Sequence, residues 1–200
     1  MSEDPTVFVV DDDPAVLGSV TKLLKIIFSR VEAYASAAAF LAAYDPSRPG
    51  CLVLDVAMPG MSGLELQRKL TEREIDLPVV FITGHGNVQM AVDAMRQGAI
   101  NFLEKPFREQ ELWDSVRKAL ETDRQKRRRR ARTERIRQRM ATLSPGERDV
   151  LQRILTGKTN RQIATELNLS VRTIEDRRGR LMKKLDASSL VELVQMALDA

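Results

Sequence analysis

Several polar residues whose side chains could take part in a reaction follow short apolar segments in the first half of the chain. A run of three aspartates, residues 11–13, comes directly after TVFVV, and Asp55 ends the segment CLVLD. Thr83 and Lys105 follow two later apolar segments. A strand that is buried on both faces ends in a charge only where that charge is paired, bound to a metal or used chemically. These positions are therefore candidate site residues.

The chemistry that suits this set is phosphoryl transfer. Converging carboxylates repel one another unless a divalent cation lies between them. Mg²⁺ fits because it binds oxygen ligands and keeps positions open for phosphate. A carboxylate beside such an ion can attack phosphorus and form an aspartyl phosphate, and Asp55 is placed to be that nucleophile. Thr83 and Lys105 can then stabilise the charge on the phosphoryl oxygens.

These residues meet only if the segments before them are neighbouring strands. Five β-rich segments alternate with five helical patterns, which predicts a doubly wound parallel sheet with helices on both faces. The reactive site of such a fold lies at the carboxyl ends of the strands. The predicted strands are 6–10, 31–34, 51–55, 78–82 and 101–104, and the predicted helices lie near 14–28, 36–43, 63–73, 87–97 and 109–121.

Charge divides the chain into two parts. Residues 1–121 carry 12 Lys and Arg against 18 Asp and Glu, whereas residues 122–200 carry 20 against 10. An acidic first part and a basic second part predict two domains, the second of which binds nucleic acid. No apolar run approaches the roughly 18–20 residues of a membrane span, and no basic leader precedes the first strand. The single cysteine, Cys51, has no disulfide partner and is expected to be a buried packing residue, so a cytoplasmic protein is predicted.

Residues 122–142 separate the two parts. The segment contains neither Gly nor Pro, so it can continue the preceding helix, but it offers almost no apolar face. We predict a basic, helical linker. Residues 124–139 hold ten Lys and Arg against one acid, Glu134. Two interpretations stay open: a solvated spacer, or a segment neutralised by DNA phosphates or by the acidic first domain.

Residues 143–200 are helical in pattern, with well-marked helix starts. Ser144, Thr159 and Ser189 each stand three residues before a Glu or Gln, which is the spacing of a capping box, and Ser170 caps the segment between the last two. These signals predict a compact bundle of four short helices.

The middle of this bundle has the pattern of a helix-turn-helix. Residues 159–185 give a short helix, a turn and a second helix whose apolar residues follow helical spacing. In a helix-turn-helix the first helix braces the second, which lies in the major groove of DNA. The basic residues expected to point outward are Arg172, Arg177, Arg178, Arg180, Lys183 and Lys184.

Four motifs together resemble the receiver domain of two-component response regulators. They are FVVDDD at 8–13, LVLDVAMPGMSG at 52–63, FITGHG at 81–86 and FLEKPF at 102–107. The resemblance implies a flavodoxin-like receiver over 1–121 in which Asp55 accepts a phosphoryl group from a sensor histidine kinase. Apart from weak self-phosphorylation and self-dephosphorylation at Asp55, no enzymatic activity is implied.

The same resemblance implies roles for the neighbouring residues. Asp11, Asp12, Asp55 and the main-chain carbonyl of Ala57 would bind Mg²⁺ (or Mn²⁺). Thr83 and Lys105 would contact the phosphoryl group, and Thr83 and Phe102 would form the switch that reports activation. Ala57 and His85 would tune water access and phosphate lifetime. On residue chemistry alone, Asp13 fits a helix cap better than a ligand, His85 reads as a loop residue, and Phe102 fits ordinary core equally well.

Residues 143–200 resemble the four-helix DNA-binding domain of the LuxR type. A receiver followed by that domain is the arrangement of the FixJ/NarL family of transcriptional regulators. The resemblance implies promoter DNA as partner, RNA polymerase as a further one, an activating role, and a homodimer that forms on phosphorylation through residues 87–104. The residues implied in DNA binding are Arg172, Thr173, Glu175, Arg177, Arg178, Lys183 and Lys184.

Two rival functions compete with this interpretation. A phosphohydrolase could use an aspartyl phosphate on a similar sheet, but it would need a DxD-type nucleophile motif after the first strand and a substrate cap. Neither DDDP nor the short loops supply these features. A regulator that binds DNA irrespective of phosphate is the second rival, and the intact set of Asp55, Thr83 and Lys105 argues against it.

Overall fold

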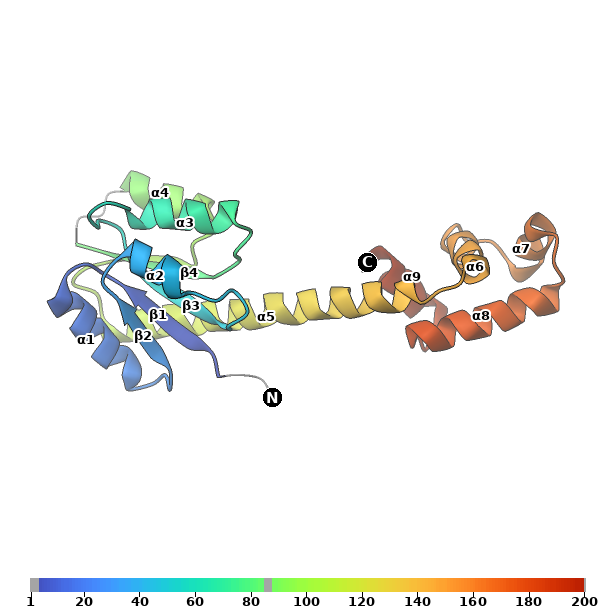
Figure 1. Cartoon of the computed structure of the whole chain (residues 1–200), viewed down its shortest axis with the longest axis horizontal. Helices are drawn as coiled ribbons and strands as arrows, with labels where there is room; N and C mark the ends of the chain where they lie inside the picture. The colour runs from blue at the N-terminus through green and yellow to red at the C-terminus, as the bar shows by residue number, and fades with distance from the viewer. Residues whose placement is uncertain (1–3, 85–87, 200) are drawn as a thin grey trace. The chain divides into compact units, whose positions relative to one another are not determined.

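A computed structural model describes residues 4–84 and 88–199 (Figure 1). The first half contains a five-stranded sheet in which every described pair of neighbouring strands is parallel. The strand order is β2-β1-β3-β4-β5, which is a doubly wound order and confirms the predicted doubly wound parallel sheet. The strands are β1 (Thr6–Val10), β2 (Val31–Tyr34), β3 (Gly50–Asp55), β4 (Val79–Thr83) and β5 (Asn101–Glu104).

Helices cover both faces of this sheet because the strands are apolar on both faces. The helices are α1 (Pro14–Lys25), α2 (Ala37–Ala43), α3 (Gly63–Glu72), α4 (Val88–Arg96) and α5 (Glu109–Ala141). In β1, Phe8 and Val10 belong to the cluster formed with α2, α3 and α4, whereas Val7 and Val9 belong to the cluster formed with α1 and α5. The strands and the first four helices agree with the predicted ranges to within a few residues.

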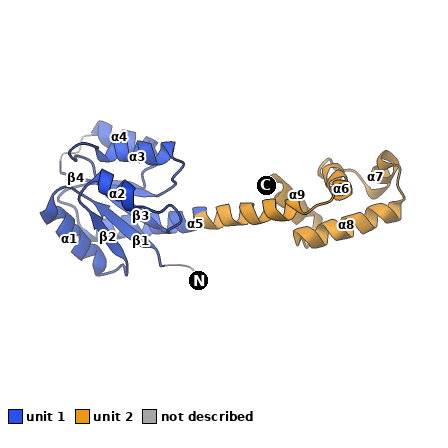
Figure 2. Ribbon diagram, viewed as in Figure 1, with its two compact units in different colours: residues 1–126 blue, residues 127–200 orange. Residues whose placement is uncertain are grey.

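Helix α5 is much longer than the fifth predicted helix. It runs for 33 residues and includes nearly the whole predicted linker. Contacts divide the chain into two compact units, residues 1–126 and 127–200, so the boundary falls inside this helix (Figure 2). The predicted linker is helical, but it does more than span solvent, because Asp123 is buried in the first unit and Ile136 in the second.

The second unit is built from the end of α5 and four short helices around one apolar core. Ile136 joins this core, and Met140 packs against it. Ser144 and Thr159 begin their helices with the predicted capping boxes. In the third predicted box, the N–H of Glu192 donates to Ser189 Oγ as expected, but the Glu192 carboxylate accepts hydrogen bonds from Ser188. The helices are α6 (Pro145–Leu155), α7 (Asn160–Leu167), α8 (Val171–Leu185) and α9 (Leu190–Asp199).

The described residues include no helix with the length and hydropathy needed to cross a membrane. Cys51 is buried in the sheet, as predicted. Burial raises the pKa of its thiol, and the Asp123 carboxylate raises it further. Because the thiolate is the reactive form of cysteine, this side chain is a packing residue.

Candidate functional site

Asp11, Asp55, Thr83 and Lys105 meet at the carboxyl edge of the sheet. The Lys105 ammonium donates hydrogen bonds to Asp11 Oδ2 at 2.8 Å and to Asp55 Oδ1 at 2.7 Å. Asp11 and Thr83 are almost fully buried, and Asp55 is 6% exposed. A single cation thus bridges two buried carboxylates from different strands.

Strand register explains why these residues meet. Val10 is paired with Leu54, so Asp11 and Asp55 follow neighbouring positions of β1 and β3. On the other side of β3, Asp55 is paired with Ile82, the residue before Thr83. The backbone N–H of Lys105 donates to the carbonyl of Thr83 at 2.7 Å, which extends the pairing of β4 and β5 by one residue.

The turn after β3 holds the Asp55 side chain. The N–H of Ala57 donates to Asp55 Oδ2 at 2.7 Å, and the N–H of Gly63 donates to the carbonyl of Val56 at 2.9 Å. A Cβ atom at Gly63 would lie 2.2 Å from the carbonyl oxygen of Asp55. Only glycine allows α3 to begin so close to Asp55. Gly63 carried no predicted role, although a glycine directly after Ser62, which caps α3, was the available signal.

The electrostatics of the site follow from burial and from this shared cation. Burial raises the pKa of Asp11, although the hydrogen bond from Lys105 opposes the change. Burial alone would lower the pKa of Lys105, but its hydrogen bonds to Asp11 and Asp55 outweigh this effect and raise it. Lys105 therefore remains an ammonium that can neutralise negative charge at the edge of the sheet.

The other acidic residues after β1 differ from Asp11 in their surroundings. Asp12 is exposed to solvent. Asp13 caps α1, because its Oδ1 accepts hydrogen bonds from the N–H groups of Ala15 and Val16. The helix-cap interpretation of Asp13 is therefore confirmed.

The site also has the donor chemistry of a Mg²⁺ site. Within residues 4–84 and 88–199, no three His, Cys, Asp or Glu side chains gather closely enough to hold a metal ion by themselves. Mg²⁺ does not require such a cluster, because it binds through one or two carboxylates and retains several waters. Asp11 and Asp55 are a buried carboxylate pair of this kind, with Asp12 next in the chain and exposed.

Phe102 and His85 were the remaining candidates in the first unit. Phe102 is partly buried and packs beside Phe81, with ring centroids 6.1 Å apart. Its ring therefore joins the core on the side of α4. His85 lies outside the described residues.

The second candidate site is the exposed face of α8. The turn between α7 and α8 is three residues long, with Asn168 in the left-handed conformation and Ser170 capping α8. Ile174, Leu181 and Leu185 face the core. The exposed residues with helical spacing on the opposite side are Arg172, Glu175, Asp176, Gly179, Arg180 and Lys183.

Several predicted DNA contacts already have partners inside the second unit. The Arg178 guanidinium donates to Asn160 Oδ1 at 2.9 Å, and Lys184 Nζ lies 2.7 Å from Glu147 Oε2. The Arg177 guanidinium packs so close to Gly146 that a Cβ atom there would be 2.7 Å from it. Thr173 is half-buried.

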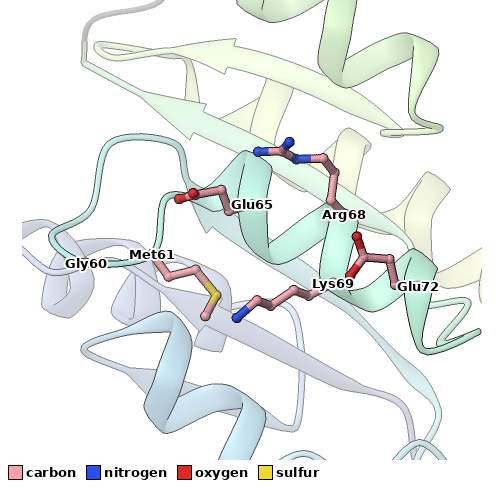
Figure 3. A pocket seen from close by; sticks show the side chains of 6 residues that line it. All are labelled: Gly60, Met61, Glu65, Arg68, Lys69 and Glu72. Atoms are coloured by element: carbon pink, nitrogen blue, oxygen red, sulfur yellow. The ribbon is translucent and has the colours of Figure 1, made fainter.

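A pocket of about 300 Å³ lies beside α3 (Figure 3). Its lining mixes both charges, and the ends of the Met61 and Lys69 side chains point toward one another. None of the predicted site residues lines it. The lining residues are Gly60, Met61, Glu65, Arg68, Lys69 and Glu72.

The chain belongs to the two-component response regulators that join a receiver domain to a LuxR-type DNA-binding domain. Residues 7–117 match the response regulator receiver domain, and residues 141–197 match the bacterial regulatory proteins of the luxR family. Both matches agree with the resemblance found in the motifs. The chain is therefore a signal-transducing regulator rather than a classical enzyme.

Similar proteins and structures agree with this family. The chain is 44% identical to nodulation protein W of Bradyrhizobium diazoefficiens, covering 96% of this chain and 84% of that protein. It is 46% identical to the transcriptional regulatory protein FixJ of Azorhizobium caulinodans, covering 99% and 94% of the two chains. The structure of the response regulator StyR has 42% identity and a TM-score of 0.87, and covers 98% of this chain and 100% of that one. Full-length FixJ from B. japonicum has 37% identity and a TM-score of 0.59, covering 100% and 98%.

Proposed function

We propose that Asp55 is the phosphoacceptor and that its phosphorylation controls DNA binding by the second unit. The observation that carries this proposal is the Lys105 ammonium, which lies within hydrogen-bond distance of both Asp11 and Asp55. This arrangement holds a carboxylate nucleophile beside a fixed positive charge at the edge of the sheet. Thr83, fully buried at the end of the next strand, supplies a hydroxyl.

In the proposed reaction, an Asp55 carboxylate oxygen attacks the phosphorus of a phosphohistidine on the sensor kinase. The P–N bond breaks, and its electron pair returns to the imidazole nitrogen. The backbone N–H of Ala57 and the Lys105 ammonium fix the orientation of the carboxylate before the attack. Lys105 and the Thr83 hydroxyl then stabilise the charge on the transferred phosphoryl oxygens.

Asp11, Asp12, Asp55 and the main-chain carbonyl of Ala57 would hold Mg²⁺ or Mn²⁺. When bound, the ion would neutralise charge on the carboxylates and on the phosphoryl oxygens. Weak self-phosphorylation and self-dephosphorylation at Asp55 belong to the same proposal, as does a switch formed by Thr83 and Phe102.

The test is the intact mass of the full chain after incubation with acetyl phosphate and Mg²⁺. Wild type is expected to gain one phosphoryl group, and Asp55→Asn none. Asp114→Asn serves as a matched control, because it removes an exposed carboxylate of the same unit and leaves every proposed site residue in place. A phosphate adduct of equal yield on Asp55→Asn would refute the assignment.

For DNA binding we propose that α8 enters the major groove and that its exposed face contacts the duplex. Arg172, Glu175 and Lys183 remain candidate contacts on this face. Arg177, Arg178 and Lys184 would reach phosphate only by leaving the intradomain positions described above, so we propose that they chiefly hold the unit together.

Promoter DNA, the sensor kinase and RNA polymerase are the proposed partners, and activation of transcription in the cytoplasm is the proposed outcome.

We also propose that the phosphorylated receiver forms a homodimer through α4 and β5. Val88, Val92 and Met95 are spaced by four and three residues along α4, and each is exposed to solvent, by 82%, 37% and 46% respectively. Large apolar side chains in a row on one helix favour burial against a second copy of the same surface. In a dimer, binding of one DNA-binding unit to its half-site raises the effective concentration of the second unit at the other half-site, so the dimer binds DNA more tightly than either unit alone.

A further inference from the structure

The second half of α5 carries a strong charge to which no comparison assigns a role. The two family matches cover residues 7–117 and 141–197, so residues 127–140 belong to neither. In the structure, however, these residues are part of the same compact unit as the helix-turn-helix. Ile136 is 3% exposed in the core of that unit, and Met140 packs against the same core.

Polar contacts fix the end of α5 to the end of α8. The Arg139 guanidinium donates to the carbonyl of Leu185 at 2.9 Å and to Asp186 Oδ2 at 3.0 Å. Both acceptors lie at the carboxyl end of α8. The charged face of α5 is therefore held on the same body as the exposed face of α8, unlike the charge of a flexible tail.

The charge on this part of α5 is nearly all of one sign. Residues 127–140 contain eight arginines and one acid, Glu134. Arg128, Arg129 and Arg132 line a groove of about 560 Å³ together with Leu198 and Asp199 of α9. The Asp199 carboxylate lies 3.9 Å from the Arg132 guanidinium, a partly exposed ion pair that a phosphate can replace. Like charges three and four residues apart destabilise an isolated helix by a few tenths of a kcal/mol per pair. A polyanion laid along the helix would remove this repulsion.

We propose that the arginine face of α5, defined by Arg128, Arg129, Arg132 and Arg135, contacts the phosphate backbone of DNA beside the segment that α8 reads. All four residues are exposed. Residues 127–139 rise by about 18 Å along the helix, which corresponds to roughly five phosphates along one strand of the duplex. The inference rests on the proposed DNA-binding function, and extends the DNA surface beyond the helix-turn-helix. Because phosphates carry no base identity, these contacts add affinity without sequence preference.

The test measures DNA affinity of the full chain against salt, for a random-sequence duplex and for a duplex selected from a random pool by the wild-type protein. Replacing all four arginines by Gln keeps good helix formers and removes four charges. Each phosphate contact contributes about −0.9 to the slope of log affinity against log salt, so the slope is expected to flatten by about 2–3 units. Affinity is expected to fall by a similar factor for both duplexes.

Two control variants test whether a change in the salt slope comes from contacts of α5 with DNA or only from the net charge of the protein. The combined variant Arg68→Gln, Lys69→Gln, Arg73→Gln and Arg117→Gln removes the same charge from exposed positions of the first unit, and is expected to keep the wild-type slope. Replacing the four α5 arginines by Lys keeps their charge, and is also expected to keep that slope.

The outcomes separate this inference from the function on which it rests. A wild-type slope in the Gln variant, or an equal flattening in the first-unit variant, would overturn the role of α5. A loss confined to the selected duplex would overturn it as well. If the α8 variant Arg172→Gln and Lys183→Gln loses its preference for the selected duplex while the α5 variant keeps its slope, the proposed function stands and this inference fails. A wild-type protein that retains no duplex from the random pool would overturn both.

Discussion

The Asp123 carboxylate in α5 accepts a hydrogen bond from the backbone N–H of Gly50 at 3.0 Å, with Asp123 itself only 2% exposed. Gly50 is the first residue of β3, and Asp55 is the last. The helix that continues into the second unit is therefore tied to the amino end of the strand that carries the proposed phosphoacceptor. A second tie is the ion pair between Lys126 and Asp76, with 2.5 Å between Nζ and Oδ1.

The Asp123 contact predicts a loss of stability when the carboxylate is removed. Asp123→Ala leaves the buried N–H of Gly50 without its acceptor, which costs about 1–3 kcal/mol of unfolding free energy in the first unit. Amide exchange in the strands measures this loss. Asp114→Ala, at an exposed position of the same helix whose ion pair with Arg117 is also exposed, is expected to change stability by less than about 0.5 kcal/mol. Equal effects of the two substitutions would show that the buried contact stabilises nothing.

The close approach of Gly63 to Asp55 predicts a sharper effect on the site. A Cβ atom at Gly63 would meet the Asp55 carbonyl oxygen at 2.2 Å, so Gly63→Ala must move either the start of α3 or the end of β3. We expect it to destabilise the first unit by about 1–3 kcal/mol and to slow phosphorylation by acetyl phosphate. The readouts are thermal unfolding and the rate of mass gain.

The chain provides a matched control for this substitution. A Cβ atom at Gly18, in the middle of α1, would meet no atom within 4 Å apart from its chain neighbours and the backbone of its own helix. Gly18→Ala is therefore expected to stabilise the protein by about 0.5–1 kcal/mol, because alanine is the better helix former. If Gly63→Ala behaved like Gly18→Ala, the tight turn would not be needed to hold Asp55.

The pair formed by Glu147 and Lys184 predicts acid sensitivity of the second unit. The hydrogen bond from Lys184 and the N–H of Ser144 hold the pKa of Glu147 below its ordinary value of 4.5. A carboxyl group whose pKa is lower in the folded state stabilises that state at neutral pH, and this contribution is lost as pH falls from about 4.5 through the lower value. Glu147→Gln is therefore expected to be less stable at pH 7 and to lose less stability on acidification.

Amide exchange in α6 and α8 of the full chain, followed between pH 7 and acidic pH, measures this effect. Asp149→Asn alters an exposed carboxyl group two residues further along α6, and is expected to leave the acid profile unchanged. Identical acid profiles for wild type and Glu147→Gln would mean that Glu147 contributes nothing to the acid response.

The fold and the meeting of Asp11, Asp55 and Thr83 at one edge of the sheet were predictable because their signals are local. Apolar runs that end in Asp11, Asp55 and Thr83 mark the carboxyl ends of strands, and parallel pairing brings such ends together. The role of Gly63 was harder to see, since its need depends on how closely α3 approaches β3. Asp123 gave no local signal, because its acceptor role depends on Gly50, far away in the chain.

In the second unit, too, the contacts of side chains with distant residues could not be predicted from the sequence. Helical spacing predicted that the basic residues of α8 point outward, and this holds for Arg172, Arg180 and Lys183. Arg178 and Lys184 instead bond to residues of α7 and α6. A long basic side chain can turn back along its own helix, so its partner depends on neighbours that the sequence pattern does not reveal.

The exposed apolar side chains of Val88, Val92 and Met95 on α4 predict a dimer that forms when the receiver is phosphorylated. Beryllofluoride serves as the analogue of the phosphoryl group, and with Mg²⁺ it is expected to double the sedimenting mass of the wild-type chain. Val92→Glu places a charge in the middle of the row between Val88 and Met95, so it is expected to stay a monomer under the same conditions. Ile26→Glu is the matched control, because Ile26 is also an exposed apolar residue, 71% accessible at the end of α1. A Val92→Glu variant that dimerises as well as Ile26→Glu would place the interface elsewhere. If beryllofluoride changed neither the mass nor the DNA affinity of wild type, the regulator would bind DNA irrespective of phosphate.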